Sequence, residues 1–135
     1  MGHPTTRYKL MMNCFMNQAE EFRNKMGLDN SRSERHIQQK LIAEEFSEFI
    51  EAARQIYDKK FYRNDQDCLK ELADLVYVCF QYAACMQWDL DEALRRVHVS
   101  NLSKLVDGKP LHREDGKVLK GPNYCPPDLL DLVNY

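Results

Sequence analysis

Four glutamates lie within residues 41–52, the apolar segment LIAEEFSEFIEA. Side chains three or four residues apart share one face of a helix, so Glu45 and Glu48 are expected to do so. A second pair with the same spacing, Glu71 and Asp74, lies inside another apolar segment. Carboxylates held close together in a half-buried site repel one another and lose hydration, unless protons or cations neutralise them.

The two carboxylate pairs come level if their segments form an antiparallel helical hairpin. In such a hairpin one chain direction runs up and the other down, so the sequence numbers of two residues that lie at the same height always add up to the same value. The numbers of Glu45 and Asp74 have the same sum as those of Glu48 and Glu71, so one register brings both pairs level. Oxygen ligands suit Mg²⁺, Mn²⁺ or Ca²⁺, and Mg²⁺ on carboxylates most often handles phosphate groups. The other interpretation is solvated helix surface, which we expect for Glu51. The residues alone leave both interpretations open.

A polar stripe of His98, Asn101 and Lys104 follows at three-residue steps in a later helical segment. An amide and an ammonium beside a metal site can bind phosphate oxygens. An ordinary solvent-facing stripe has the same pattern, so this alternative also stays open.

The elements that carry these residues are expected to be helices. Pro4 is the only proline before Pro110, and no glycine lies between Gly27 and Gly108, which is typical of long helices. Ser31 and Glu34 form a capping-box pattern. Apolar periodicity predicts helices over residues 6–26, 32–57, 66–87 and about 90–105, with a polar connection over 58–67.

The expected fold is therefore all-α, a bundle of four to five helices in a single domain of residues 1–135. Residues 106–135 hold four of the five prolines and three of the five glycines, so they are expected to form an irregular extension. Two Asp-Gly-Lys tripeptides, 107–109 and 115–117, predict tight turns there.

Composition narrows the functional classes. A formal charge of −2 and an isoelectric point near 6.1 argue against a general nucleic-acid binder. We expect no membrane span, because no apolar run approaches about 20 residues, and no signal peptide. Five cysteines without a Cys-x-x-Cys pair favour free thiols in a reducing cytoplasm.

The segments EEFSE at 44–48 and ELAD at 71–74 resemble the E-E-x-x-E…E-x-x-D signature of the all-α nucleoside triphosphate pyrophosphatases. That superfamily includes MazG, the dimeric dUTPases, the dCTP pyrophosphatases and phosphoribosyl-ATP pyrophosphatase. Residues 97–129 look like the MazG-like subgroup close to phosphoribosyl-ATP pyrophosphatase. The resemblance covers residues 35–130.

The resemblance implies a Mg²⁺- or Mn²⁺-dependent enzyme that cleaves a (d)NTP between its α and β phosphates, giving a monophosphate and pyrophosphate. It implies a homodimer or homotetramer whose active sites involve neighbouring chains. dUTP is one candidate substrate, and phosphoribosyl-ATP is not assigned, because no specificity signature is recognised. A non-catalytic nucleotide- or metal-binding regulatory or interaction protein on the same helical fold is the alternative.

Site residues carry over by position. The implied metal ligands are Glu45, Glu48, Glu71 and Asp74. Glu44 would orient or deprotonate the attacking water. Lys104 is expected to act in catalysis and, with Asn101, to hold phosphate. The further expected substrate contacts are Phe15, Asn17, Gln18, Lys120 and Tyr124. Apolar surface for a second subunit is expected at Met11, Met12, Phe15 and Phe80.

Overall fold

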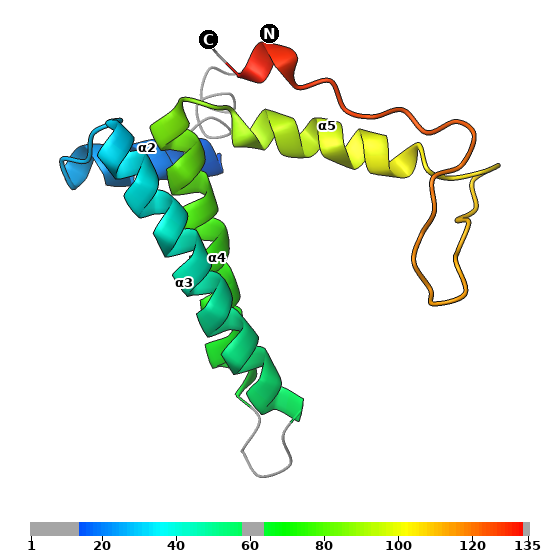
Figure 1. Cartoon of the computed structure of the whole chain (residues 1–135), viewed down its shortest axis with the longest axis horizontal. Helices are drawn as coiled ribbons and strands as arrows, with labels where there is room; N and C mark the ends of the chain where they lie inside the picture. Colours follow the sequence, from blue (N-terminus) through cyan, green and yellow to red (C-terminus); the bar gives the residue numbers. More distant parts are fainter. Residues whose placement is uncertain (1–13, 58–63, 134–135) are drawn as a thin grey trace, which may run out of the picture. The chain divides into compact units, whose positions relative to one another are not determined.

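The computed structural model describes residues 14–57 and 64–133 of the chain. Its described helices confirm the all-α prediction, since these residues contain no β-strand (Figure 1). The elements are α2 (Phe15–Lys25), α3 (Arg32–Tyr57), α4 (Asp65–Met86), α5 (Leu90–Leu102) and the 3₁₀ helix η1 (Leu130–Leu132). The first part of the helix predicted over 6–26 lies outside the described residues.

Side chains cap the start of all four described α-helices, and the Cys14 thiol caps α2 by accepting from the Asn17 backbone N–H at 3.3 Å. The Ser31 hydroxyl accepts a hydrogen bond from the Glu34 backbone N–H at 3.1 Å, which confirms half of the predicted capping box. The Asn64 side chain caps α4 through the Asp67 N–H at 3.0 Å. The Asp89 side chain caps α5 in the same way, through the N–H of the third following residue at 3.0 Å. Local sequence therefore sets where these helices start.

α5 ends at Leu102, before the expected residue 105. The Lys104 N–H bonds to the Asn101 carbonyl at 3.2 Å, and the Leu105 N–H bonds to the Leu102 carbonyl at 3.2 Å. Such bonds, spanning three residues, tighten the last turn and stop the α-helix.

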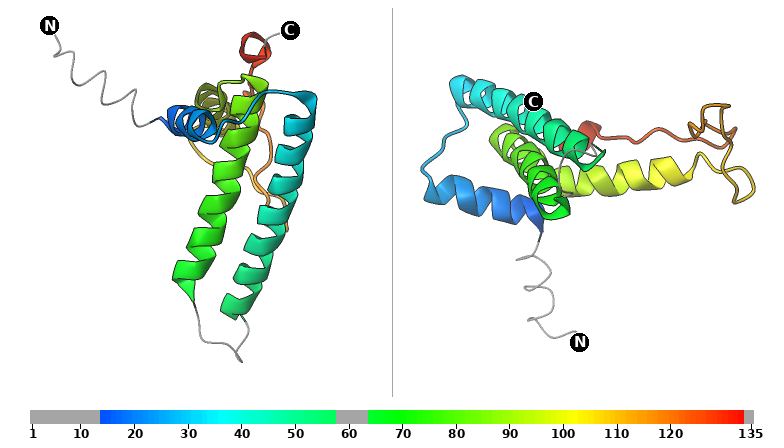
Figure 2. Two further views of the ribbon diagram at one scale, coloured as in Figure 1. Left: turned by 90° about the vertical axis from the view of Figure 1, so that its left-hand side faces the viewer. Right: turned by 90° about the horizontal axis from the view of Figure 1, so that it is seen from below.

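The chain forms two compact units, Met1–Trp88 and Asp89–Tyr135. In the first unit, α3 and α4 lie side by side as an antiparallel hairpin, and α2 packs against α4 (Figures 1 and 2). The Phe15 and Phe80 rings, with centroids 5.4 Å apart, join α2 to α4. Phe80 is 5% exposed, so the expectation that it offers surface to a second subunit is wrong. It fills the core instead, because α2 covers it.

In the second unit, α5 holds the C-terminal extension. The first Asp-Gly-Lys turn is confirmed: Val106 and Lys109 exchange backbone hydrogen bonds of 2.8 and 2.9 Å, and Asp107 and Gly108 have φ of 50° and 74°. Further along, the Arg96 guanidinium binds both carboxylate oxygens of Asp131, at 2.6 and 3.0 Å. Hydrogen bonds between Arg96 and Asp131 thus hold the C-terminal extension against α5. No helix among residues 14–57 and 64–133 has the length and apolar character to cross a membrane.

Candidate metal centre

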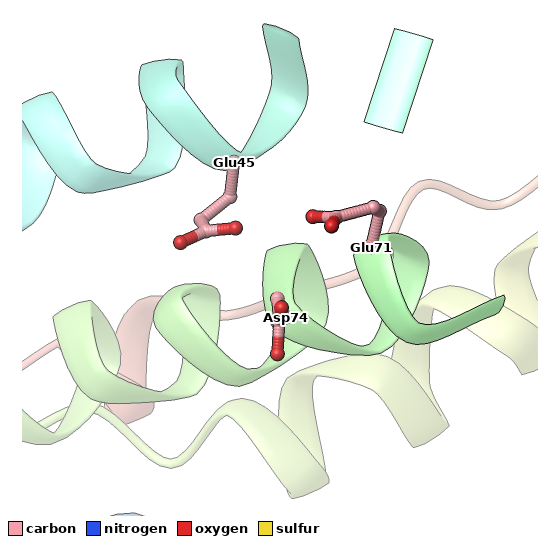
Figure 3. A group of neighbouring side chains, drawn as sticks. All are labelled: Glu45, Glu71 and Asp74. Carbon is pink, nitrogen blue, oxygen red and sulfur yellow. The ribbon is translucent and has the colours of Figure 1, made fainter. Parts of the chain in front are cut away.

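Three carboxylates meet where α3 faces α4. Glu45 projects from α3 toward Glu71 and Asp74 on α4 (Figure 3). One carboxylate oxygen from each residue lies within 4.8 Å of the other two. The hairpin register predicted from the residue numbers brings these three side chains together. We refer to Glu45, Glu71 and Asp74 as the carboxylate cluster.

Two oxygens of the carboxylate cluster are buried and accept no hydrogen bond from the described residues. Glu45 Oε2 and Glu71 Oε2 have no hydrogen-bond partner among the described residues. Burial raises the pKa of the Glu45 carboxyl group, and the charges of Glu48, Asp74 and Glu71 raise it further. A buried oxygen without a partner costs free energy, so the cluster is short of positive charge. Three carboxylates, two of which have an orphaned oxygen, are a donor set that fits a hard divalent cation such as Mg²⁺ or Mn²⁺.

Lys70 also belongs to this centre, although its residue type and position were not predicted to contribute. Its Nζ lies 2.8 Å from Asp74 Oδ2 and 3.4 Å from Glu71 Oε1. Hydrogen bonding to Asp74, with the Asp74 and Glu71 charges, raises the pKa of the Lys70 ammonium. The four-residue step from Lys70 to Asp74 is the sequence signal that could have indicated this contact.

The other glutamates of α3 lie outside the carboxylate cluster. Glu48 is exposed and is near enough to raise the pKa of Glu45. It lines an adjacent open hollow of about 490 Å³ with Glu51 and Arg54, among others. Glu44 and Glu51 are exposed. The water-handling role of Glu44 and the ligand role of Glu48 stay predictions.

An apolar pocket of about 330 Å³ lies between α2 and α4. Of the expected substrate contacts, Phe15 and Gln18 line it, whereas Asn17 is not part of its wall. The remaining wall consists of Ala19, Leu69, Leu72, Ala73, Val76, Tyr77 and Phe80. An apolar wall with one amide is typical of a site for a flat ring, although binding at this pocket stays a prediction.

The remaining predicted residues belong to the second unit. Asn101 is exposed and Lys104 is half-buried, and they lie at the end of α5 and just after it. The Lys120 Nζ lies 4.7 Å from the centroid of the Tyr124 ring, which is a cation–π contact. Their approach to a substrate held by the first unit stays a prediction.

Comparison with known families gives one match. The model of the family described as phosphoribosyl-ATP pyrophosphohydrolase matches residues 12–101, more than half of the chain. The matched region contains the whole α3–α4 hairpin and the carboxylate cluster. Members of this family generally use a divalent metal ion, in agreement with the donor set at this centre. The search of curated proteins gave no match.

Proposed function

The chain belongs to the phosphoribosyl-ATP pyrophosphohydrolase family, and on that premise we propose that it hydrolyses a nucleoside triphosphate between the α and β phosphates. The family indicates a hydrolase acting on phosphoric anhydrides, and the specific reaction is our proposal. The products would be a nucleoside monophosphate and pyrophosphate. The observation that carries the proposal is the carboxylate cluster, two of whose buried oxygens have no hydrogen-bond partner within residues 14–57 and 64–133.

We assign the acidic residues of the hairpin to metal binding. Glu45, Glu71 and Asp74 would hold Mg²⁺ or Mn²⁺, with Glu48 as a further ligand. When bound, such an ion lowers the pKa of water and neutralises charge on the phosphates. Glu44, one residue before Glu45, would orient the attacking water or accept its proton.

Phosphoryl transfer needs positioning and charge stabilisation rather than a protein nucleophile. We assign this role to Asn101 and Lys104, whose amide and ammonium would hold phosphate oxygens, with Lys104 also stabilising the charge that develops during the reaction. Lys120 and Tyr124 would contact the substrate from the extension. Phe15, Gln18 and the apolar pocket would receive the base, with Asn17 nearby.

The substrate class is tested with a nucleotide panel. Purified protein with Mg²⁺ is incubated with each NTP and dNTP, dUTP included, and with phosphoribosyl-ATP, and pyrophosphate is measured. We expect pyrophosphate from at least one triphosphate. Release of orthophosphate only would overturn the proposed bond cleavage. Tight nucleotide binding without turnover would favour the non-catalytic alternative.

The metal assignment is tested with Glu71→Gln, which keeps the side-chain shape and removes the charge. A ligand that binds only the folded state raises the melting temperature, so Mn²⁺ should stabilise the wild type. The Glu71→Gln variant should lose most of this rise and at least about 100-fold of the turnover rate. Glu51→Gln is the matched control on α3, because Glu51 is exposed and outside the cluster. Equal behaviour of both variants would contradict the assignment.

We further propose that the active form is a homodimer or homotetramer. The support is an exposed apolar row on α4, where Leu69 is 66%, Leu72 40% and Val76 45% exposed. Phe15 of α2, 57% exposed, continues this surface, which also forms the wall of the apolar pocket, so a second copy would close over the proposed base site. Apolar side chains gathered on one face are typical of a protein–protein contact.

A further inference from the structure

Lys70 engages two members of the carboxylate cluster. It precedes Glu71 by one residue and Asp74 by one helical turn on α4. Its Nζ lies 2.8 Å from Asp74 Oδ2 and 3.4 Å from Glu71 Oε1. No other ion pair between described residues reaches these carboxylates. Two of the four proposed metal ligands therefore already bind an ammonium group.

The ammonium and a divalent ion compete for the same two carboxylate groups, those of Asp74 and Glu71. Mg²⁺ requires carboxylate oxygens at about 2.0–2.1 Å in a nearly fixed geometry. An ion bound to Asp74 and Glu71 would lie only a few ångströms from Lys70 Nζ, and two positive charges at that separation repel. Full coordination by these two side chains therefore requires the ammonium to move away.

Lys70 is free to move. Its side chain is 64% exposed, and a lysine ammonium is carried on a flexible four-carbon stem. Ion pairs at such exposure are weak, so water can replace the carboxylates as its partners at small cost.

The ammonium also leaves the interior of the cluster uncompensated. Glu45 forms no ion pair with it, and the Oε2 atoms of Glu45 and Glu71 have no hydrogen-bond partner among the described residues. Lys70 thus neutralises the solvent-facing side of the site and not its buried side. A divalent ion that contacts all three carboxylates would compensate both sides, so it can displace the ammonium.

We propose that Lys70 is an internal counter-ion, which occupies Asp74 and Glu71 in the metal-free chain and is displaced when a divalent cation binds. The inference rests on the proposed function, because it takes the carboxylate cluster as the metal ligands. It deepens that function by making Lys70 a residue that sets the metal concentration at which the site loads.

The test measures Mn²⁺ binding by isothermal titration calorimetry, without nucleotide, for the wild type and for Lys70→Met. Removing the competitor should tighten Mn²⁺ binding about two- to fivefold, as expected for loss of one exposed ion pair. Lys25→Met is the matched control. Lys25 pairs with Glu21 on α2 at 3.1 Å, with the same four-residue spacing and similar exposure. Its removal should leave the affinity unchanged.

A second measurement separates displacement from a general charge effect. In a crystal structure of the wild type with Mn²⁺, Lys70 Nζ should lie more than about 4 Å from both Asp74 and Glu71, beyond ion-pair distance. Unchanged or weaker Mn²⁺ binding by Lys70→Met, or an ammonium that stays in place beside the bound ion, would overturn the inference alone. A wild type that binds no Mn²⁺ would overturn the proposed metal site as well.

Discussion

The Glu45 carboxyl group takes up a proton more readily in the folded chain than in the unfolded chain. Burial and the neighbouring carboxylates raise its folded-state pKa above the ordinary value for glutamic acid. The sign of the effect follows from linkage: ionised Glu45 opposes folding. The loss of folding stability caused by ionised Glu45 is absent at a pH below the unfolded-state pKa of its carboxyl group. It reaches its full size once the pH exceeds the folded-state pKa.

Replacing Glu45 with glutamine should therefore stabilise the metal-free protein at neutral pH. With a chelator present, the melting temperature of Glu45→Gln should exceed that of the wild type at about pH 7 by a few degrees. The difference should vanish at about pH 3.5, below the ordinary glutamate pKa of about 4.3, because Glu45 is then protonated in both states. Thermal melts followed by circular dichroism measure both values.

Glu51→Gln is again the matched control, since exposed Glu51 lies outside the carboxylate cluster. It should show little difference from the wild type at either pH. With Mn²⁺ in place of the chelator, the order at neutral pH should reverse, because the glutamine variant loses a proposed ligand. A glutamine variant that is less stable than the wild type in chelator at neutral pH would contradict this account of Glu45.

At the scale of elements, the ends of α2 and α4 use the same backbone conformation with different residues. Gly27 follows α2 with φ of 66°, and Gln87 caps α4 with φ of 60°. The left-handed region costs a residue with a side chain roughly 1–2 kcal/mol and costs glycine almost nothing. Gln87 thus carries strain at the end of the helix that holds Glu71 and Asp74.

Opposite substitutions at these two ends should have opposite effects. Gln87→Gly should raise the free energy of unfolding by up to about 1 kcal/mol, because it removes the strain of the left-handed conformation. The increase is smaller than the strain itself, because glycine also gives the unfolded chain more conformational freedom. Gly27→Ala should lower it by about 1 kcal/mol, although a Cβ at Gly27 would meet no atom within 4 Å. Urea denaturation measures both. A stabilising effect of Gly27→Ala would show that backbone strain is not the cause.

Local signals explain why the helices could be predicted from the sequence. Two helix starts are indicated by capping residues, Ser31 followed by Glu34, and Asp89. At each start a side-chain oxygen accepts a hydrogen bond from a backbone N–H that has no partner within the helix. The antiparallel pairing then brings Glu45 level with Asp74, since two helices in one hairpin keep a constant register. Most of the first unit and the three clustered carboxylates follow from these rules.

The remaining details of the site depend on side-chain conformation, which spacing does not determine. Glu45 and Glu48 share a face of α3, yet Glu45 joins the carboxylate cluster while Glu48 stays exposed. Lys70 could have paired with Glu71, with Asp74 or with water, and the order lysine before aspartate is the less favoured one in a helix. The four-residue step permits the contact with Asp74, and the structure shows that the ammonium reaches Glu71 as well.

At the scale of the whole molecule, the described part of the first unit, residues 14–57 and 64–88, buries few large side chains for its length. Its buried apolar residues are Met16, Ala19, Ala52, Phe80, Ala83, Ala84 and Cys85, most of which are small. Larger apolar side chains of α4, such as Leu69 and Val76, remain exposed. A second copy of the chain could bury them, which would add hydrophobic stabilisation of roughly 25 cal/mol per Å² covered.

The double change Leu69→Gln and Val76→Thr tests whether α4 forms this subunit contact. Because both residues are already exposed, the change should cost the isolated chain little stability. It should weaken association at least about tenfold if these side chains lie at the centre of the interface. Light scattering over a dilution series should show a dimer or tetramer for the wild type, and the variant should dissociate at a higher protein concentration.

Ile37→Gln on α3 is the control, since Ile37 is 50% exposed and lies outside the α4 row. A wild type that is monomeric at every concentration would contradict the oligomer. An oligomer weakened by Ile37→Gln and not by the double change would place the contact on α3.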